Sequence, residues 1–281
     1  MSSTLYIVAT PIGNLEDITH RAIRILGEVD LIACEDTRHT RKLLNHFGIN
    51  TKTISYHDHN ETERAPELLR ELEKGSDVAL VSDAGTPGIS DPGFRIVRLC
   101  LERGISVVPV PGPTAFVSAL VASGFPTDEF FFAGFLPAKK NQRRAKLNEL
   151  SAIDTTLVFY EAPHRIAETL KDAREVLGER KAVVARELTK LHEEIRHGTL
   201  SELETHFASG ERARGEMVLV IDRTVTATAE AISKETIGEL VAQLEAEGID
   251  SRAALKQAAK RLGISRDEAY RRMVAERIVR R

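Results

Sequence analysis

The sequence contains only two cysteines, Cys34 and Cys100, among its 281 residues. Each stands in an apolar stretch, LIACED and VRLCLE, which is typical of buried thiols, and two cysteines exclude a disulfide framework. The sequence also lacks any run near the roughly 18 apolar residues of a membrane-spanning helix, and its first residues, MSSTLYIVATPIGN, contain no basic segment typical of a secretion signal. We therefore expect a cytoplasmic protein.

Motifs of several common enzyme classes are absent as well. The loop after the first predicted strand reads PIGN at residues 11–14, not the G-x-G-x-x-G of dinucleotide-binding proteins, and we recognise no P-loop, zinc pattern, Ser-His-Asp order or Cys-His order. His57 and His59 could supply two metal ligands, but no third partner stands at a diagnostic spacing, so we predict no metal site. These absences disfavour hydrolysis by an activated nucleophile and favour transfer from a bound small cofactor, where positioning supplies much of the rate.

What the sequence does contain is an alternation of apolar β-type runs and amphipathic helical runs. Strands are predicted at residues 5–10, 29–34, 53–56, 78–81 and 105–110. Helices are predicted between them, and this alternation indicates a parallel α/β sheet. Further strands are predicted at residues 130–136, 156–160, 182–186 and 217–221, with a polar segment before residue 200. They indicate a second α/β layer built on a mixed sheet.

We predict three parts: an N-terminal α/β domain (1–123), a second α/β domain (124–223) and a basic helical unit (230–281). The last part has apolar residues at helical spacing, and Ser265 and Glu268 form a capping box in a helix-turn-helix-like pattern. The chain has a net charge of −3, yet from residue 250 onward ten Lys and Arg face four Asp and Glu. A basic end on an acidic body suggests an anionic partner, although a solvated basic surface or a protein-binding or dimerisation unit are alternatives.

Small and polar residues gather where the predicted strands end. The longest such loop is SDAGTPGISDPG after strand 78–81, and shorter ones read PIGN, EDTRH and PGPTA. Ligand crevices of open α/β sheets form outside the carboxyl ends of their strands, so we expect these loops to build one binding site.

These loops carry a resemblance to a known family. ATPIGNLEDIT, CEDTR, SDAGTPGISDPG, PGPTA, FYEAPHRI and GEMVLVI resemble the tetrapyrrole-methylase-like family of S-adenosylmethionine-dependent methyltransferases, and within it the branch that modifies ribosomal RNA. The resemblance covers the whole chain and implies two α/β domains of the tetrapyrrole-methylase type, S-adenosylmethionine as cofactor and a homodimer. The implied substrate is small-subunit (16S) ribosomal RNA, methylated at the 2′-oxygen of a cytidine in the decoding region. Relatives that act on corrins have a glycine-rich first loop, and PIGN in its place favours the RNA branch.

The resemblance also implies site residues. Those carried over to cofactor binding are Pro11, Ser82, Asp83, Ala84, Gly85, Thr86, Pro87, Ile89, Thr114, Ala115, Tyr160, Arg186 and Met217. A ribose hydroxyl must lose its proton during methyl transfer, so a base or an orienting group is needed. The candidates are Asp36, Asp83, Glu187 and Lys190. The sequence does not choose among them, and each carboxylate has the alternative of capping a helix or forming a surface ion pair.

RNA contacts are predicted from clustered cations, because RNA affinity depends on neutralising phosphates. The candidates are Arg38, Lys139, Lys140, Arg143, Arg144, Arg266, Arg271 and Arg272. Two other functions stay open. A small-molecule methylase of the tetrapyrrole type would use the same loops without needing a basic end, and a non-enzymatic nucleic-acid-binding protein would need only the terminal unit.

Overall fold

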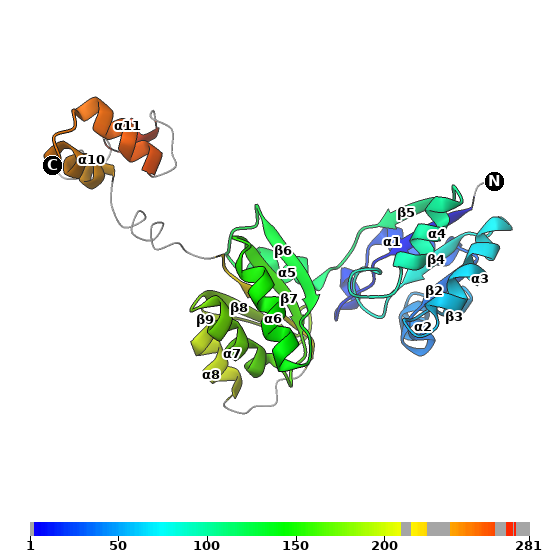
Figure 1. Ribbon diagram of the computed structural model, residues 1–281. Coiled ribbons are helices and arrows are strands. Elements are labelled where there is room, and N and C mark those ends of the chain that lie inside the picture. The colour runs from blue at the N-terminus through cyan, green and yellow to red at the C-terminus, as the bar shows by residue number, and fades with distance from the viewer. Residues whose placement is uncertain (1–2, 209–214, 224–236, 262–267, 272, 274–281) are drawn as a thin grey trace. The chain divides into compact units, whose positions relative to one another are not determined.

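The computed structural model describes residues 3–208, 215–223, 237–261, 268–271 and 273 (Figure 1). The chain divides into two compact units, Met1–Arg223 and Thr224–Arg281. The first contains two five-stranded sheets and the second a group of helices. No helix within the described ranges is long and apolar enough to span a membrane.

The first sheet is parallel throughout, as the sequence predicted, and its strand order is β3-β2-β4-β1-β5. Its strands are β1 (Thr4–Val8), β2 (Leu31–Cys34), β3 (Thr53–Ser55), β4 (Val78–Val81) and β5 (Ser106–Val110). Every residue of β2 and β4 is buried, because helices cover both faces of the sheet. Burial on both sides explains why LIAC and VALV contain no polar residue.

Two pairs of helices lie on opposite faces of this sheet. They are α1 (His20–Glu28), α2 (Thr37–His46), α3 (Glu61–Glu73) and α4 (Phe94–Glu102). Leu26 of α1 and Leu44 of α2 pack into one core, whereas Leu68 of α3 and Ile96 of α4 pack into another. The strands β1 and β2 lead to α1 and α2 on one face, whereas β4, which lies between them, leads to α4 on the other face. The loops after these strands therefore diverge at the carboxyl edge of the sheet. Such a divergence leaves the crevice in which open α/β sheets bind ligands.

The second sheet is mixed, with the order β6-β7-β10-β8-β9, and only β6 and β7 run parallel. Its strands are β6 (Phe130–Phe135), β7 (Thr156–Glu161), β8 (Lys181–Arg186), β9 (Glu194–Thr199) and β10 (Met217–Ile221). The strand β9 falls in the segment that the sequence showed only as polar. It is an edge strand in which no residue is fully buried, so it has no apolar alternation to reveal it.

Helices also cover both faces of the second sheet. They are α6 (Lys140–Ser151), α7 (Ile166–Leu177) and α8 (Leu200–Ala208) on one face and α5 (Ala115–Ala122) on the other. The packing of α5 corrects the predicted domain limits, which assigned it to residues 1–123. Ala119 and Leu120 of α5 contact the core formed by Val158 and Val218 of the second sheet. The segment AFVSALVA is apolar on nearly every side, so its pattern does not indicate which sheet it covers.

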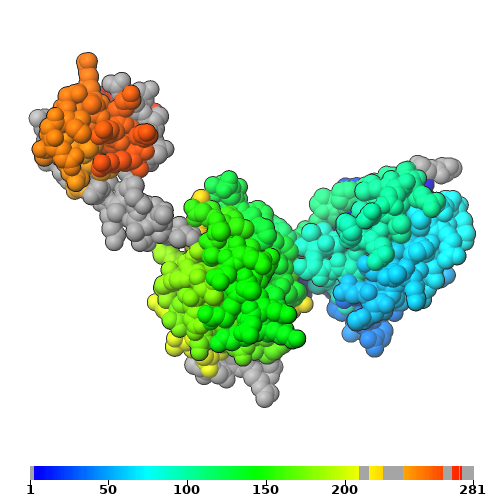
Figure 2. Space-filling view, in the orientation of Figure 1, coloured from blue at the N-terminus to red at the C-terminus, as the bar shows by residue number. Residues whose placement is uncertain are grey.

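The second unit has its own apolar core. Its described helices, α10 (Ile237–Ala246) and α11 (Ser251–Arg261), are orange in Figure 2. They pack together through residues that include Leu240, Leu244 and Leu255. Asp250 begins α11 by accepting hydrogen bonds from the backbone of the next turn. Both helices were predicted; Glu268 is helical, while Ser265 of the predicted capping box lies outside the described residues.

Candidate active site

The loops at the carboxyl edge of the first sheet are joined by hydrogen bonds. Thr10, after β1, and Gly85, after β4, exchange two backbone hydrogen bonds of 2.9 Å each. Gly85 has φ +85°, a conformation that favours glycine. The hydroxyls of Thr86 and Thr114 lie 2.8 Å apart and so connect the loops after β4 and β5. PIGN, SDAGTPGISDPG and PGPTA therefore form one continuous surface, as their positions after parallel strands predicted.

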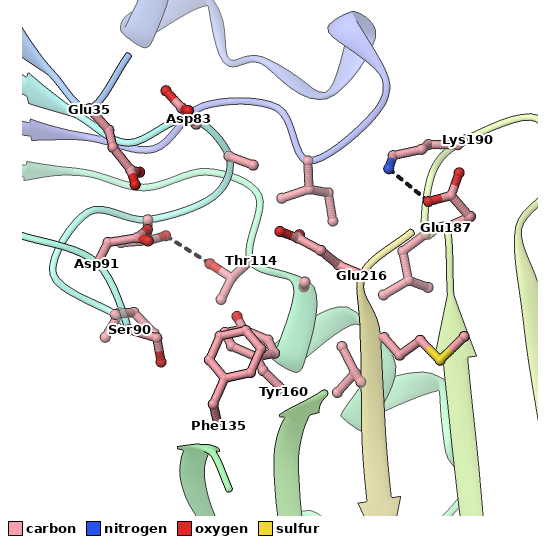
Figure 3. A pocket seen from close by; sticks show the side chains of 18 residues that line it. Glu35, Asp83, Ser90, Asp91, Thr114, Phe135, Tyr160, Glu187, Lys190 and Glu216 are labelled. Carbon is pink, nitrogen blue, oxygen red and sulfur yellow. Dashed lines mark hydrogen bonds and ion pairs between the residues drawn. The ribbon is translucent and has the colours of Figure 1, made fainter. Parts of the chain in front are cut away.

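A pocket of about 240 Å³ opens on this surface and takes side chains from both sheets (Figure 3). Glu35, Asp83 and Asp91 come from loops of the first sheet, and Glu187 and Glu216 from the ends of strands of the second. The remaining lining residues are Ile12, Ala84, Thr86, Ile89, Ser90, Thr114, Ala115, Phe135, Tyr160, Leu188, Lys190, Met217 and Val218.

The lining is strongly acidic. Its five carboxylates face a single cation, Lys190, which pairs with Glu187 at 2.9 Å. Burial raises the pKa of Asp91 to about 6, the nearby Glu35 adds to the rise, and a hydrogen bond with Ser82 opposes it. Burial also raises the pKa of Glu35, with Asp83 as the next cause. The pocket thus suits a ligand with positive charge, which would relieve the repulsion between the carboxylates.

The loops around the pocket have unusual backbone conformations. Ser90, Glu187 and Thr189 have φ values of 62°, 49° and 65°, which residues other than glycine adopt at a cost. A Cβ at Gly13 would collide with the side chain of Lys190, and a Cβ at Gly215 would collide with the carboxylate of Glu187. The strained conformations and the two glycines together position Glu187 and Lys190 at the pocket.

Most of the predicted cofactor residues line this pocket. They are Asp83, Ala84, Thr86, Ile89, Thr114, Ala115, Tyr160 and Met217. Of the candidates for proton transfer, Asp83, Glu187 and Lys190 line it too. We find these residues together at one site, and their roles stay predictions.

The other predicted cofactor residues, Pro11, Ser82, Gly85, Pro87 and Arg186, do not line the pocket. The hydroxyl of Ser82 donates to the carbonyls of Ala84 and Gly85 and so shapes the turn from within. The guanidinium of Arg186 pairs with Glu194 on the edge strand β9. Ser82 thus supports the loop that carries the lining residues Asp83 and Ala84.

The structure corrects one candidate for proton transfer, Asp36. Its carboxylate caps α2 and pairs with Arg38, whose guanidinium holds the pKa of Asp36 well below its ordinary value. Asp36 does not line the pocket, and its backbone N–H instead donates to Asp83 Oδ1 over 3.0 Å. The backbone of Asp36 therefore positions Asp83. Its side chain caps a helix, which was the alternative to a role in proton transfer.

A second correction concerns Arg143, which was predicted to contact RNA. Arg143 is 1% exposed and pairs with Asp172 at 2.7 Å inside the second domain. Its neighbour Arg144 pairs with Asp172 and Glu175. A buried guanidinium in an ion pair cannot reach a phosphate, so Arg143 stabilises the packing of α6 on α7.

The remaining cations predicted to bind RNA are Arg38, Lys139, Lys140, Arg266, Arg271 and Arg272. Arg38, Lys139 and Lys140 are exposed, and Arg271 pairs with Glu268. Arg266 and Arg272 lie outside the described residues.

Sequence reasoning missed eight lining residues: Ile12, Glu35, Ser90, Asp91, Phe135, Leu188, Glu216 and Val218. Asp91 stands in the same loop as Asp83, and Glu35 stands directly before Asp36, so their positions after strands were a usable signal. The others depend on how the second sheet approaches these loops. Gly134, for example, has φ +63° and a Cβ there would lie 3.0 Å from Oγ of Ser90.

The arrangement can hold a small ligand that is part cationic and part apolar. Carboxylates lie on one side, and Tyr160, Phe135, Met217 and Leu188 offer aromatic and aliphatic surface. Within the described ranges, no three His, Cys, Asp or Glu residues are grouped to hold a metal ion.

Comparison with known proteins agrees with this geometry. Residues 4–204 match the family model of Tetrapyrrole (Corrin/Porphyrin) Methylases. The chain is 48% identical over 275 residues to "Ribosomal RNA small subunit methyltransferase I" of Mesorhizobium japonicum, covering 98% of this chain and 92% of that protein. It is 56% identical over 219 residues to the protein of the same name from Vibrio cholerae, covering 77% and 76%.

Solved structures resemble the chain at lower sequence identity. Uroporphyrin-III-C-methyltransferase from Thermus thermophilus has a TM-score of 0.55 and 20% identity, covering 78% of this chain and 94% of that one. A cobalt precorrin-4 methyltransferase has a TM-score of 0.56 and 18% identity, covering 77% and 94%. At such identities the likeness shows a shared fold.

Proposed function

Because this chain belongs to the tetrapyrrole (corrin/porphyrin) methylases and, within them, to the ribosomal RNA small subunit methyltransferases I, we propose that it methylates a ribose of 16S ribosomal RNA. The methyl donor is S-adenosylmethionine. The acceptor that we propose is the 2′-oxygen of a cytidine in the decoding region of the small subunit.

The observation that carries this proposal is the composition of the pocket. S-adenosylmethionine supplies a methyl group on a positively charged sulfonium and also bears an ammonium group and an adenine ring. Its positive charges suit the carboxylates of Glu35 and Asp83, and its adenine suits the apolar surface of Leu188 and Met217. The hydroxyls of Thr86 and Thr114 are available to its polar atoms. The donor set therefore fits this cofactor.

The chain itself must remove the ribose proton and hold the hydroxyl in line with the methyl group. Asp83 already accepts a hydrogen bond from the backbone of Asp36, and Glu187 is paired with Lys190. Asp91 lies in the same pocket, and its raised pKa of about 6 makes its carboxylate a stronger base than an ordinary one. We assign proton removal to Asp91, with Asp83 and Glu187 orienting the reactants.

RNA binding, a homodimer and a cytoplasmic location belong to the same proposal. Lys139 and Lys140 are exposed at the start of α6, and the second unit carries further exposed cations on α11.

Phe94 and Leu101 of α4 are 74% and 63% exposed, which is unusual for large apolar side chains and suits a surface shared by two copies.

The test is incubation with labelled S-adenosylmethionine and unmodified small subunits, or naked 16S RNA, followed by mapping of the labelled nucleotide. We expect label on the 2′-oxygen of one cytidine in the decoding region. Subunits that already carry the modification are the control and should take up no label. Label on a base nitrogen, or on a precorrin-like small molecule in place of RNA, would overturn the proposal.

A further inference from the structure

Helix α2 presents a cationic surface that the proposed reaction has not used. Its sequence, TRHTRKLLNH, contains no acidic residue. Arg38, His39, Lys42 and His46 are exposed, whereas Thr40, Leu43 and Leu44 face the core. In Figure 1 this helix, drawn in blue, lies at the surface of the first sheet. Arg38 and Lys42 are one turn apart on the outer face, so the two charges form a short row.

This charge distribution does not serve the stability of the helix. The amino end of a helix carries partial positive charge, so stabilising side chains near it are acidic. In α2 no acidic residue stands in the first turn, and Arg38 is its second residue, whereas Arg41 and Lys42 lie at the middle of the helix. Asp36, the cap, is the compensating charge and pairs with Arg38. The cations are therefore better explained by binding an anion than by folding.

The helix begins directly at the pocket. Glu35, which lines the pocket, is three residues before Arg38, and Asp36 connects to the lining residue Asp83 through its backbone N–H at 3.0 Å. Figure 3 shows Glu35 and Asp83 on the same side of the pocket. Arg38 and Lys42 thus extend outward from the site of methyl transfer.

The pocket is acidic, whereas the adjacent surface of α2 is cationic. A nucleotide whose ribose enters the pocket brings two flanking phosphates, and the five carboxylates there repel them. The phosphates must be neutralised outside, on a cationic surface close to the opening. The side chain of Arg38 is 88% exposed, and an exposed ion pair such as Arg38–Asp36 is weak enough to exchange for a phosphate.

Resting on the proposed function, we propose that Arg38 and Lys42 of α2 bind the RNA phosphates next to the nucleotide that is methylated. His39 lies on the same exposed side and completes this surface. Arg41 does not belong to it, since its guanidinium is half-buried and donates to the hydroxyl of Thr53 over 3.0 Å. The acidic pocket then takes the cationic cofactor, and α2 takes the anionic backbone of the substrate.

The test compares two double variants of the full chain in binding to unmodified 16S RNA at several salt concentrations. Each phosphate contact to single-stranded RNA contributes about 0.7 to the slope of log K against log salt, so Arg38→Gln with Lys42→Gln should lower the slope by about 1.4. The matched control is Arg70→Gln with Lys74→Gln, which removes the same charge near the end of α3, at the amino edge of the same sheet. The control should leave the slope unchanged.

Two further measurements separate the possible failures. The affinity for S-adenosylmethionine should be the same in both variants and in the original protein, which shows that the fold and pocket are intact. Arg38→Lys with Lys42→Arg should restore the slope, because it restores both charges. An unchanged slope in the glutamine variant, from a protein that still methylates the RNA, would refute the role of α2 and leave the proposed function standing. Failure of the original protein to methylate RNA would instead overturn the proposed function.

Discussion

At the scale of the residue, Asp91 is the group to which we assign removal of the ribose proton. It lies among Glu35, Asp83 and Glu216, and both burial and these negative neighbours favour its protonated form. Ser90, which precedes it, is held in a left-handed conformation beside Gly134. A raised pKa in a pocket, with a strained neighbour, is typical of a group with a chemical role.

We expect the rate of methyl transfer to depend on pH through Asp91. Its pKa of about 6 means that the carboxylate is protonated, and unable to accept a proton, below that pH. The value of kcat/KM should therefore rise about tenfold per pH unit below pH 6 and level off above it. Asp91→Asn should lower the rate by about 10²–10⁴-fold and abolish the fall in rate below pH 6, as measured from kcat/KM for S-adenosylmethionine between pH 5 and 8.

A variant of Glu35 provides the control for assigning proton removal to Asp91. Because the charge of Glu35 helps to raise the pKa of Asp91, Glu35→Gln should move the limb to lower pH while leaving its shape unchanged. A rate that does not vary with pH, or an Asp91→Asn variant with full activity, would show that another group removes the ribose proton.

At the scale of the element, the loop after β1 and the loop after β8 depend on a close approach that only glycine allows. Gly13 lies against the side chain of Lys190. A Cβ added at Gly13 would also lie 3.0 Å from the backbone carbonyl oxygen of Leu188. The backbone contact cannot yield as a flexible side chain can. The loop that carries Leu188 and Lys190 therefore depends on the absence of a side chain at residue 13.

We expect Gly13→Ala to weaken the binding of S-adenosylmethionine about tenfold, because it displaces a loop that lines the pocket. Isothermal titration calorimetry measures the change. Gly27→Ala is the matched control: Gly27 lies in α1, and an added Cβ has no atom within 4 Å, so its affinity should be unchanged. Equal affinities for both variants would show that the loop adjusts freely and does not shape the site.

At the scale of the whole molecule, the two units have separate cores and differ in charge: the first has 28 Lys and Arg against 33 Asp and Glu, and the second has 11 against 9. The helices α10 and α11 pack around their own apolar residues, and no residue of the first unit belongs to that cluster. From residue 250 onward cations outnumber carboxylates, whereas the whole chain is net negative. The division suggests that the first unit holds the cofactor and that the second adds affinity for a polyanion.

We expect a protein that ends at Arg223 to remain folded and to bind S-adenosylmethionine with unchanged affinity. Its affinity for 16S RNA should fall at least tenfold, and the salt dependence of binding should become shallower, because phosphate contacts are lost. Fluorescence anisotropy with labelled RNA at several salt concentrations measures both. Full affinity with an unchanged slope would leave the helical unit without a role in RNA binding.

Much of this could be predicted from the sequence, because strands and helices follow from local patterns. Runs such as VALV and LIAC indicate buried strands, and small residues after them indicate the loops of a binding edge. The same loops carry the family resemblance, and thus the cofactor and the type of reaction. Asp83, Thr86 and Thr114 were predicted from this resemblance, and the strands before them predicted only that their loops lie at the crevice.

What only the tertiary structure decided depends on partners far apart in the chain. Arg143 and Lys140 are equally basic in sequence, yet Arg143 meets Asp172 and is buried while Lys140 stays exposed. The side chain of Ser82 turns inward, and Asp91, nine residues later, reaches the pocket. Local periodicity carries no information about which distant side chain meets which. The direction of a loop residue, the sheet that α5 covers and the charge of the assembled pocket are therefore set by packing alone.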